Sequence, residues 1–162
     1  VETLASRSNQ VIDKNRFDAD YAKVRLCGQS VFLLKPLTYM NRSGFPTQRF
    51  AAYHKVEIQD IIVVHDDMDL AFGQLKIVKN RGHGGHNGVR SIIDCFGKKE
   101  FIRVRLGVGH PGSGKNVTGH VLGRFTPDES RGIDQLIEAG ADACCGILED
   151  GVTAAMNQFN SA

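Results

Sequence analysis

The chain has 162 residues and a mass of 17.7 kDa, which is the length of one domain. Apolar residues make up 41% of the sequence, charged residues 23%, and the net charge is +2, which excludes disordered, collagen-like and coiled-coil chains. No apolar run is long enough to cross a membrane, and no basic stretch followed by an apolar one opens the chain. The four cysteines have no metal-binding spacing. We therefore expect a single domain over residues 1–162, located in the cytoplasm.

The first half of the chain is predicted to form, in order, a helix at 1–6, hairpin strands at 21–26 and 31–35, a helix at 44–55 and a strand at 61–64. The hairpin is predicted from alternating apolar and polar residues around the turn Cys27-Gly28-Gln29. Four β-branched residues at 61–64 predict a strand that is buried on both faces. The helix at 1–6 has no capping residue ahead of it, so we expect that the chain begins inside an element.

The second half is predicted to form a strand at 75–78, a helix at 87–96, a strand at 101–106, and helices at 126–150 and 152–159. The long helix has the clearest boundaries, because Thr126-Pro127-Asp128-Glu129 is a capping sequence and Asp150-Gly151 a terminating one. Residues 101–106 alternate apolar and basic side chains, which is typical of a strand with one solvated or ligand-facing side. Together these elements predict an α/β fold, with a single-domain mixed β-sheet flanked by helices.

Basic residues and glycines are concentrated in one part of the chain. Nine Lys or Arg residues against two acidic ones give residues 76–115 a charge of +7, and ten of the 18 glycines lie between positions 82 and 119. Positive charge and accessible backbone N–H groups suit an anion, and phosphate backbones are the commonest large anions that proteins bind. The pattern therefore indicates nucleic-acid binding, with a solvated basic surface as the alternative.

Three clusters of polar side chains follow predicted strands or open a predicted helix. They are Thr38-Tyr39-Met40-Asn41, His65-Asp66-Asp67-Met68-Asp69 and His83-Gly84-Gly85-His86-Asn87. Ligands of open α/β sheets collect beyond the carboxyl ends of strands, so we expect the three clusters to converge on one pocket.

Two chemistries are compatible with such a pocket. A metal-dependent hydrolase would draw its ligands from His65, Asp66, Asp69, His83 and His86. A metal-free hydrolase would use a carboxylate to orient a histidine base, while Asn41 and Asn87 hold a water molecule and a polarised carbonyl. Each of these side chains also has an ordinary structural role open to it, such as capping a turn or bonding to the backbone.

Four ordered segments resemble the bacterial-type peptidyl-tRNA hydrolase family: residues 35–44 (KPLTYMNRSG), 64–70 (VHDDMDL), 82–88 (GHGGHNG) and 103–112 (RVRLGVGHPG). They occur in the family's order and spacing, and the similarity extends from Val1 to the C-terminal helices. The resemblance implies an esterase without a cofactor, which cleaves the bond between a peptide and the 3′ ribose of tRNA. It also implies peptidyl-tRNA as the partner of a monomer that needs no membrane and no obligate protein partner.

The resemblance implies roles for residues of the pocket. Asp66 would orient and support the catalytic histidine, while Asn41 and Asn87 would contact the peptide and the tRNA 3′ end and help to hold water. His86 would neighbour the attacking water or the tRNA end. Three further residues would line or adjoin the cleft: Tyr39, Met40 and His110.

Arg105 is similar to a basic residue with which the family clamps the 5′-phosphate of tRNA. The family's partner lysine falls near Val78, so Lys79 or Lys76 would take its place. Phosphate contacts of this kind bind many tRNAs without reading their sequence.

One part of the family pattern is not found in these residues. The family's opening strand, Asn-Pro-Gly turn and catalytic-histidine loop precede the helix at 1–6, and none of the six histidines occupies that position. We therefore expect an N-terminally incomplete domain of an active parent, which by itself hydrolyses little or nothing. A non-catalytic RNA-binding relative is the alternative, although Asn41, Asp66 and Asn87 are residues of a hydrolytic cleft.

Overall fold

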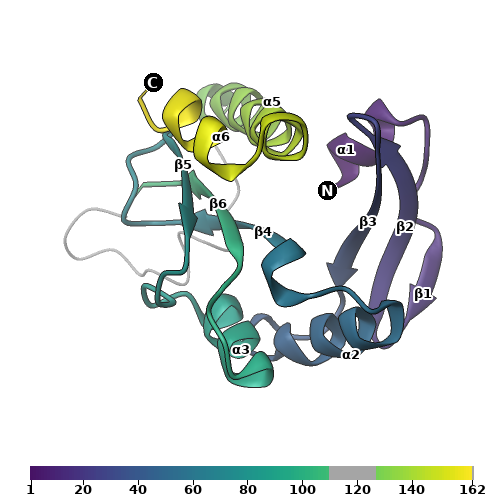
Figure 1. The fold of residues 1–162 in the computed structure, drawn as a ribbon. Coiled ribbons are helices and arrows are strands. Elements are labelled where there is room, and N and C mark those ends of the chain that lie inside the picture. The colour runs from purple at the N-terminus through teal and green to yellow at the C-terminus, as the bar shows by residue number, and fades with distance from the viewer. Residues whose placement is uncertain (110–126, 162) are drawn as a thin grey trace.

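The computed structural model describes residues 1–109 and 127–161, which form two three-stranded sheets with helices packed around them (Figure 1). The strands are β1 (Lys14–Arg16), β2 (Ala19–Leu26), β3 (Gln29–Pro36), β4 (Ile62–Asp67), β5 (Leu75–Lys79) and β6 (Ile102–Gly107). The helices are α1 (Glu2–Arg7), α2 (Gly44–His54), α3 (Asn87–Phe96), α5 (Pro127–Asp150), α6 (Val152–Phe159) and the short 3₁₀ helices η1 (Met40–Arg42) and η2 (Ile58–Asp60). These elements confirm the predicted α/β class.

The N-terminal sheet has the order β1-β2-β3 and is antiparallel throughout. The predicted hairpin is confirmed, because β2 and β3 are joined by a two-residue turn in which Cys27 has φ 49° and Gly28 φ 77°. Two left-handed residues give such a turn the twist that the flanking strands need. Alternation along the strands then directs Ala22, Val24 and Leu33 into the main core.

The second sheet is mixed, as predicted, and has the order β4-β6-β5. β4 runs parallel to β6, whereas β5 runs antiparallel to it. The hairpin does not join this sheet within the described residues, because its strands pair with each other and with β1. The part of the chain that the structure describes therefore has two sheets where the sequence predicts one.

β4 is longer and more exposed than its sequence predicts. It continues past Val64 through His65, Asp66 and Asp67, and each of these pairs with a residue of β6. The prediction that residues 61–64 are buried on both faces is wrong, because in the described part of the chain β4 has a hydrogen-bonded neighbour on one side only and Val64 is 36% exposed. The three polar residues consequently lie on a strand, where the register with β6 sets their positions.

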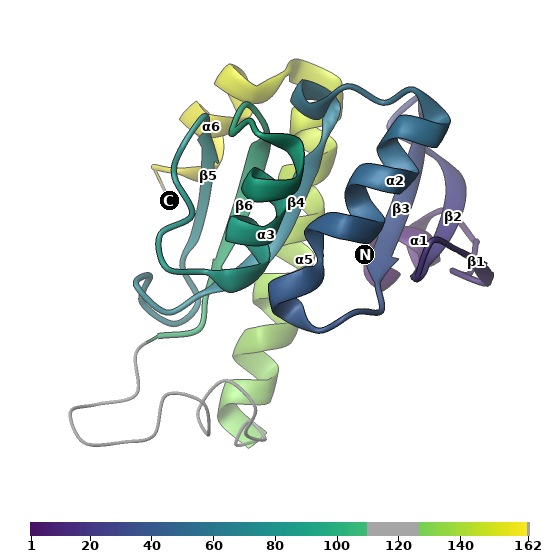
Figure 2. The same ribbon diagram turned by 90° about the horizontal axis from the view of Figure 1, so that it is seen from below.

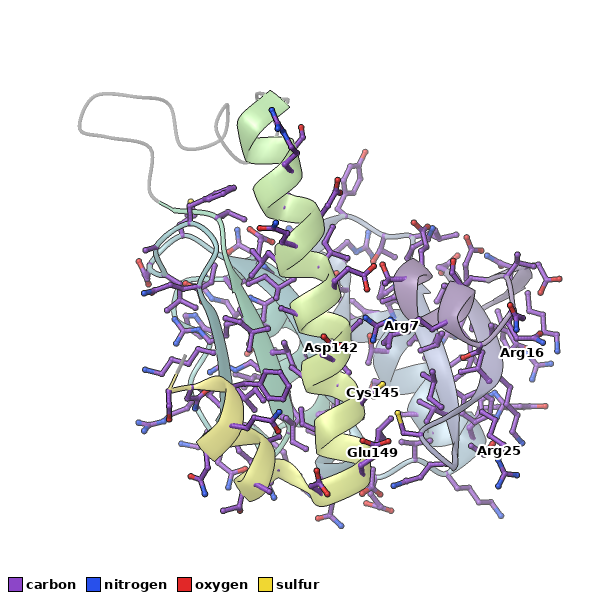
Figure 3. The ribbon with its side chains drawn as sticks, turned by 90° about the horizontal axis from the view of Figure 1, so that it is seen from above. Arg7, Arg16, Arg25, Asp142, Cys145 and Glu149 are labelled. Carbon is purple, nitrogen blue, oxygen red and sulfur yellow. The ribbon has the colours of Figure 1, made fainter. Side chains whose placement is uncertain are left out.

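The long helix α5 connects the two sheets through the main hydrophobic core. Ala141 and Ile147 of this helix pack in one cluster with buried residues of β2, β3, β5 and β6. Arg7 of α1 donates to Asp142 at 2.7 Å, and the two side chains meet in Figure 3. The predicted long helix is thus confirmed, although its capping residue Thr126 lies outside the described residues. None of the helices that the structure describes is long and apolar enough to cross a membrane.

The residue after α6 closes the outer edge of β5. Asn160 accepts a hydrogen bond from the backbone N–H of Ile77 at 2.7 Å and donates one to the backbone carbonyl of the same residue at 3.0 Å. Its side-chain amide therefore occupies the place where a further strand would pair with β5.

Helices α2 and α3 lie side by side (Figures 1 and 2) and touch through a glycine. The backbone N–H of Gly44 donates to Ser91 Oγ at 2.9 Å, and a Cβ at position 44 would collide with the carbonyl group of Ser91. A second, smaller core fixes α3 against η2 and the second sheet, and its buried members are Ile58, Val89, Ile92 and Phe101. This packing brings η1, which precedes α2, to the N-terminal end of α3.

Candidate active site

Asp66 of β4 and His86, which precedes α3, form a carboxylate–imidazole pair. Asp66 Oδ1 lies 3.4 Å from His86 Nε2, and the Asp66 side chain is 38% exposed. His86 Nδ1 accepts hydrogen bonds from the backbone N–H groups of Gly88 and Val89 at 3.1 and 3.2 Å, so the imidazole caps α3. An accepting Nδ1 carries no proton, which assigns the ring proton to Nε2, where it faces Asp66.

This pair keeps Asp66 charged. The hydrogen bond from His86 lowers the pKa of Asp66 below its ordinary value and outweighs the opposite effect of burial. Asp66 is therefore a solvent-accessible carboxylate at neutral pH, and it is able to accept a further hydrogen bond or to support a nearby cation.

The neighbouring His65 is a buried, neutral histidine. Its Nδ1 donates to the backbone carbonyl of Asp66 at 2.6 Å, and its ring centroid lies 4.5 Å from that of His86. His65 Nε2 is buried, and no group of the described residues forms a hydrogen bond with it. Burial lowers the pKa of His65 to about 4, so this ring supports the pair by packing and carries no charge at neutral pH.

The first polar cluster reaches the same end of α3 through Met40. A Cβ at Gly88 would lie 2.5 Å from Met40 Sδ and 3.1 Å from His86 Cε1, so both side chains pack onto this glycine. Three more of the residues predicted for the cleft lie in the described part of the chain and are exposed: Tyr39, Asn41 and Asn87. The three polar clusters of the sequence therefore meet at the N-terminal end of α3.

Arg105, the predicted phosphate ligand, is held by a carboxylate. Its Nε donates to Asp67 Oδ2 at 2.6 Å, and the two side chains are 21% and 12% exposed. Burial raises the pKa of Asp67, but the hydrogen bond and charge of Arg105 outweigh this effect and leave the pKa lowered. The strand register pairs Arg105 with Lys76, whereas Lys79 pairs with Ile102. Because side chains alternate along a strand, Lys76 shares a face of the sheet with Arg105 and Lys79 does not.

Comparison with known proteins agrees with this geometry. A family model described as peptidyl-tRNA hydrolase matches residues 1–162. The chain belongs to the peptidyl-tRNA hydrolase family. Peptidyl-tRNA hydrolases of Clostridium botulinum and Bacillus cereus are 39% and 40% identical to it over 160 and 161 residues, which cover 99% of this chain and 84% and 87% of theirs. The crystal structure of peptidyl-tRNA hydrolase from Acinetobacter baumannii has a TM-score of 0.90 at 35% identity and covers 99% of this chain and 82% of that one.

Membership of the peptidyl-tRNA hydrolase family does not favour the metallohydrolase or the non-catalytic RNA-binding protein considered from the sequence. Across residues 1–109 and 127–161, no three His, Cys, Asp or Glu side chains are grouped so that they could hold a metal ion. The expectation that the family's opening strand and histidine loop are missing receives no support, since the family model matches from residue 1.

Sequence reasoning missed one member of this peptidyl-tRNA hydrolase site. The sequence places Asp67 in a polar cluster without a role of its own, whereas in the structure it accepts the backbone N–H of Asp69 and anchors Arg105. Only the register between β4 and β6 reveals this contact, because nothing in the local sequence links the two residues. His86 does bond to the backbone, which was the structural alternative for it. His110 lies outside the described residues, so its place near the cleft stays a prediction.

Proposed function

We propose that this chain hydrolyses peptidyl-tRNA, cleaving the ester at the 3′ ribose to free the peptide and the tRNA. The observation that carries the proposal is the family match over residues 1–162, and the charged, accessible Asp66 supports it. The relatives described above are named peptidyl-tRNA hydrolases. We further propose that the chain acts in the cytoplasm as a single-domain monomer, with no cofactor and no obligate protein partner.

The residues around Asp66 suit the hydrolysis of an ester. That reaction needs a base for the attacking water and hydrogen bonds that hold the reacting group. Asp66 is suited to orient an imidazole base and to stabilise the imidazolium that forms when the base takes a proton. The exposed amides of Asn41 and Asn87 can each donate and accept a hydrogen bond at the first peptide unit, beside apolar contacts from Tyr39 and Met40.

The base that Asp66 supports is, in this proposal, none of the four described histidines. His86 uses Nδ1 to cap α3 and directs Nε2 toward Asp66, so it is a positioning residue. His65 and His54 each have a buried Nε2, the latter among aromatic rings. His83 accepts a backbone N–H of the glycine loop at Nδ1. His110 and His120 lie outside the described residues, so this exclusion covers the described part of the chain only. On the described residues alone, we expect slow hydrolysis of peptidyl-tRNA.

Arg105 is proposed to bind the 5′-phosphate of tRNA together with Lys76 or Lys79. Asp67 holds Arg105 through Nε, so the terminal guanidinium nitrogens remain available to an anion. The strand register favours Lys76 as the partner because it lies beside Arg105 on the same face.

Chemical rescue tests the proposed function and also whether the chain supplies its own base. The 162-residue chain is incubated with an N-acetyl-aminoacyl-tRNA, with and without added imidazole, and the released N-acetyl-amino acid is measured. We expect slow hydrolysis that imidazole accelerates. Asp66→Asn should lower the imidazole-dependent rate by about 100-fold or more, because the carboxylate orients and stabilises the base. Asp60→Asn is the matched control, an exposed carboxylate ahead of the same strand and outside the three polar clusters, and should keep the rate.

The rates with and without imidazole test the proposal about the base and the proposed function of the site separately. Hydrolysis that is fast in plain buffer and insensitive to imidazole would refute the proposal about the base. Hydrolysis that is absent under both conditions, or that Asp66→Asn leaves unchanged, would refute the proposed function of the site.

A further inference from the structure

An open hollow lies between α2 and α3, next to the proposed active site. Its volume is about 380 Å³, and it is lined by Asn41, Phe45, Gln48, Ser91, Asp94 and Cys95. The two helices that form its walls run side by side in Figures 1 and 2. Because Asn41 belongs both to the hollow and to the proposed cleft, a substrate held at the cleft can continue into the hollow.

Helix α3 leads from the cleft along this hollow. Asn87, Ser91 and Asp94 are spaced i, i+4 and i+7, so they share one face of the helix. At about 1.5 Å of rise per residue, Asp94 lies roughly 10 Å along the helix axis from Asn87. An extended peptide covers that distance with about three residues, at roughly 3.3 Å each.

The far end of the hollow is anionic. Asp94 is exposed and makes no hydrogen bond or ion pair within the described residues. The Cys95 thiol beside it stays neutral because burial raises its pKa. At the end near the cleft the charge is opposite, since the Arg42 guanidinium lies 5.6 Å from the centre of the Phe45 ring. The hollow therefore favours a positive group at its far end only.

We infer that this hollow binds the peptide part of peptidyl-tRNA, and that Asp94 selects a lysine or arginine about three residues from the ester. The inference rests on the proposed function for its substrate. Between the cleft and Asp94, Phe45 is 53% exposed and offers an apolar surface to the bound peptide. The amides of Asn41 and Gln48 line the same hollow. A carboxylate that is otherwise unpaired gains an ion pair when such a peptide binds.

Binding of non-hydrolysable analogues tests the inference without relying on catalysis. Three-residue peptides with an acetylated N-terminus are joined to tRNA by a 3′ amide, and they differ only in Lys or Glu at the residue farthest from the tRNA. We expect the Lys analogue to bind about two- to five-fold tighter, which is the size of a solvent-exposed ion pair. The preference should shrink as salt is raised.

Substitutions in the protein and in the peptide test whether Asp94 causes the preference for the Lys analogue. Asp94→Asn, which keeps the shape of the side chain, should abolish the preference, and Asp94→Lys should reverse it. Asp13→Asn, an exposed carboxylate in the segment before β1, should leave the preference intact. Moving the Lys to the residue next to the tRNA should also remove it, because Asp94 is then out of reach.

Equal binding of the two analogues to the unmodified chain would overturn the inference, and so would a preference that survives Asp94→Asn. A preference seen equally with Lys next to the tRNA would place the recognition elsewhere. Failure of ester hydrolysis in the rescue experiment would instead refute the proposed function, while the binding comparison still decides the role of Asp94.

Discussion

Replacing His65 should remove a large part of the pH dependence of folding between pH 7.5 and 5. Burial lowers the pKa of His65 in the folded chain to about 4 from an ordinary value of 6.5. As the pH falls below 6.5, the unfolded chain takes up a proton that the folded chain refuses until about pH 4, so stability is lost on acidification. The linkage amounts to about 2 kcal/mol between pH 7.5 and 5 and to about 3 kcal/mol in full.

Urea unfolding at several pH values measures this effect. The sequence contains no Trp, so unfolding is followed by far-UV circular dichroism. His65→Gln keeps an amide that is able to donate to the Asp66 carbonyl but does not titrate. The difference in unfolding free energy between the two proteins should therefore narrow by about 2 kcal/mol from pH 7.5 to 5. Above pH 7.5 the two curves should run parallel. If the unfolding free energies of the unmodified chain and of His65→Gln changed in parallel down to pH 5, the role given to His65 would be refuted.

Four further substitutions probe the helix contact and the proposed phosphate site. Gly44→Ala should lower the free energy of unfolding by about 1–3 kcal/mol, although alanine is the better helix former, because its Cβ collides with the Ser91 carbonyl. Thermal unfolding measures this, and an unchanged or higher Tm would contradict the packing. Arg105→Ala and Lys76→Ala should each weaken tRNA binding and reduce its salt slope by about one, and Lys79→Ala should do less. Filter binding over a salt series measures the slopes, and a larger effect of Lys79→Ala would reverse the assignment.

Local chemistry predicted much of the fold. The turn at Cys27 and Gly28 joins strands whose alternation is visible in the sequence, and Gly151 ends α5 as expected. The extent of β4 was not predictable in this way. His65 and Asp66 resemble loop residues, and they are held in a strand by hydrogen bonds to β6, which lies far along the chain. Pairing between distant segments is the part that local patterns do not contain.

The same distinction applies to the site. The sequence identified Asp66 and His86 as neighbours in function, since each lies in a distinctive polar cluster. It could not assign the bonding of each ring nitrogen in His86, which depends on where α3 begins. Nor could it choose between Lys76 and Lys79, because only the register of β5 against β6 shows which of them lies beside Arg105.

The side-chain amide of Asn160 makes the residue after α6 a structural part of the second sheet. Removing residues 160–162 would leave the backbone N–H and carbonyl of Ile77 without these hydrogen bonds. A strand from another copy of the chain could then pair with the exposed edge of β5. Trimmed proteins should consequently self-associate at concentrations where the intact chain does not, which light scattering would detect.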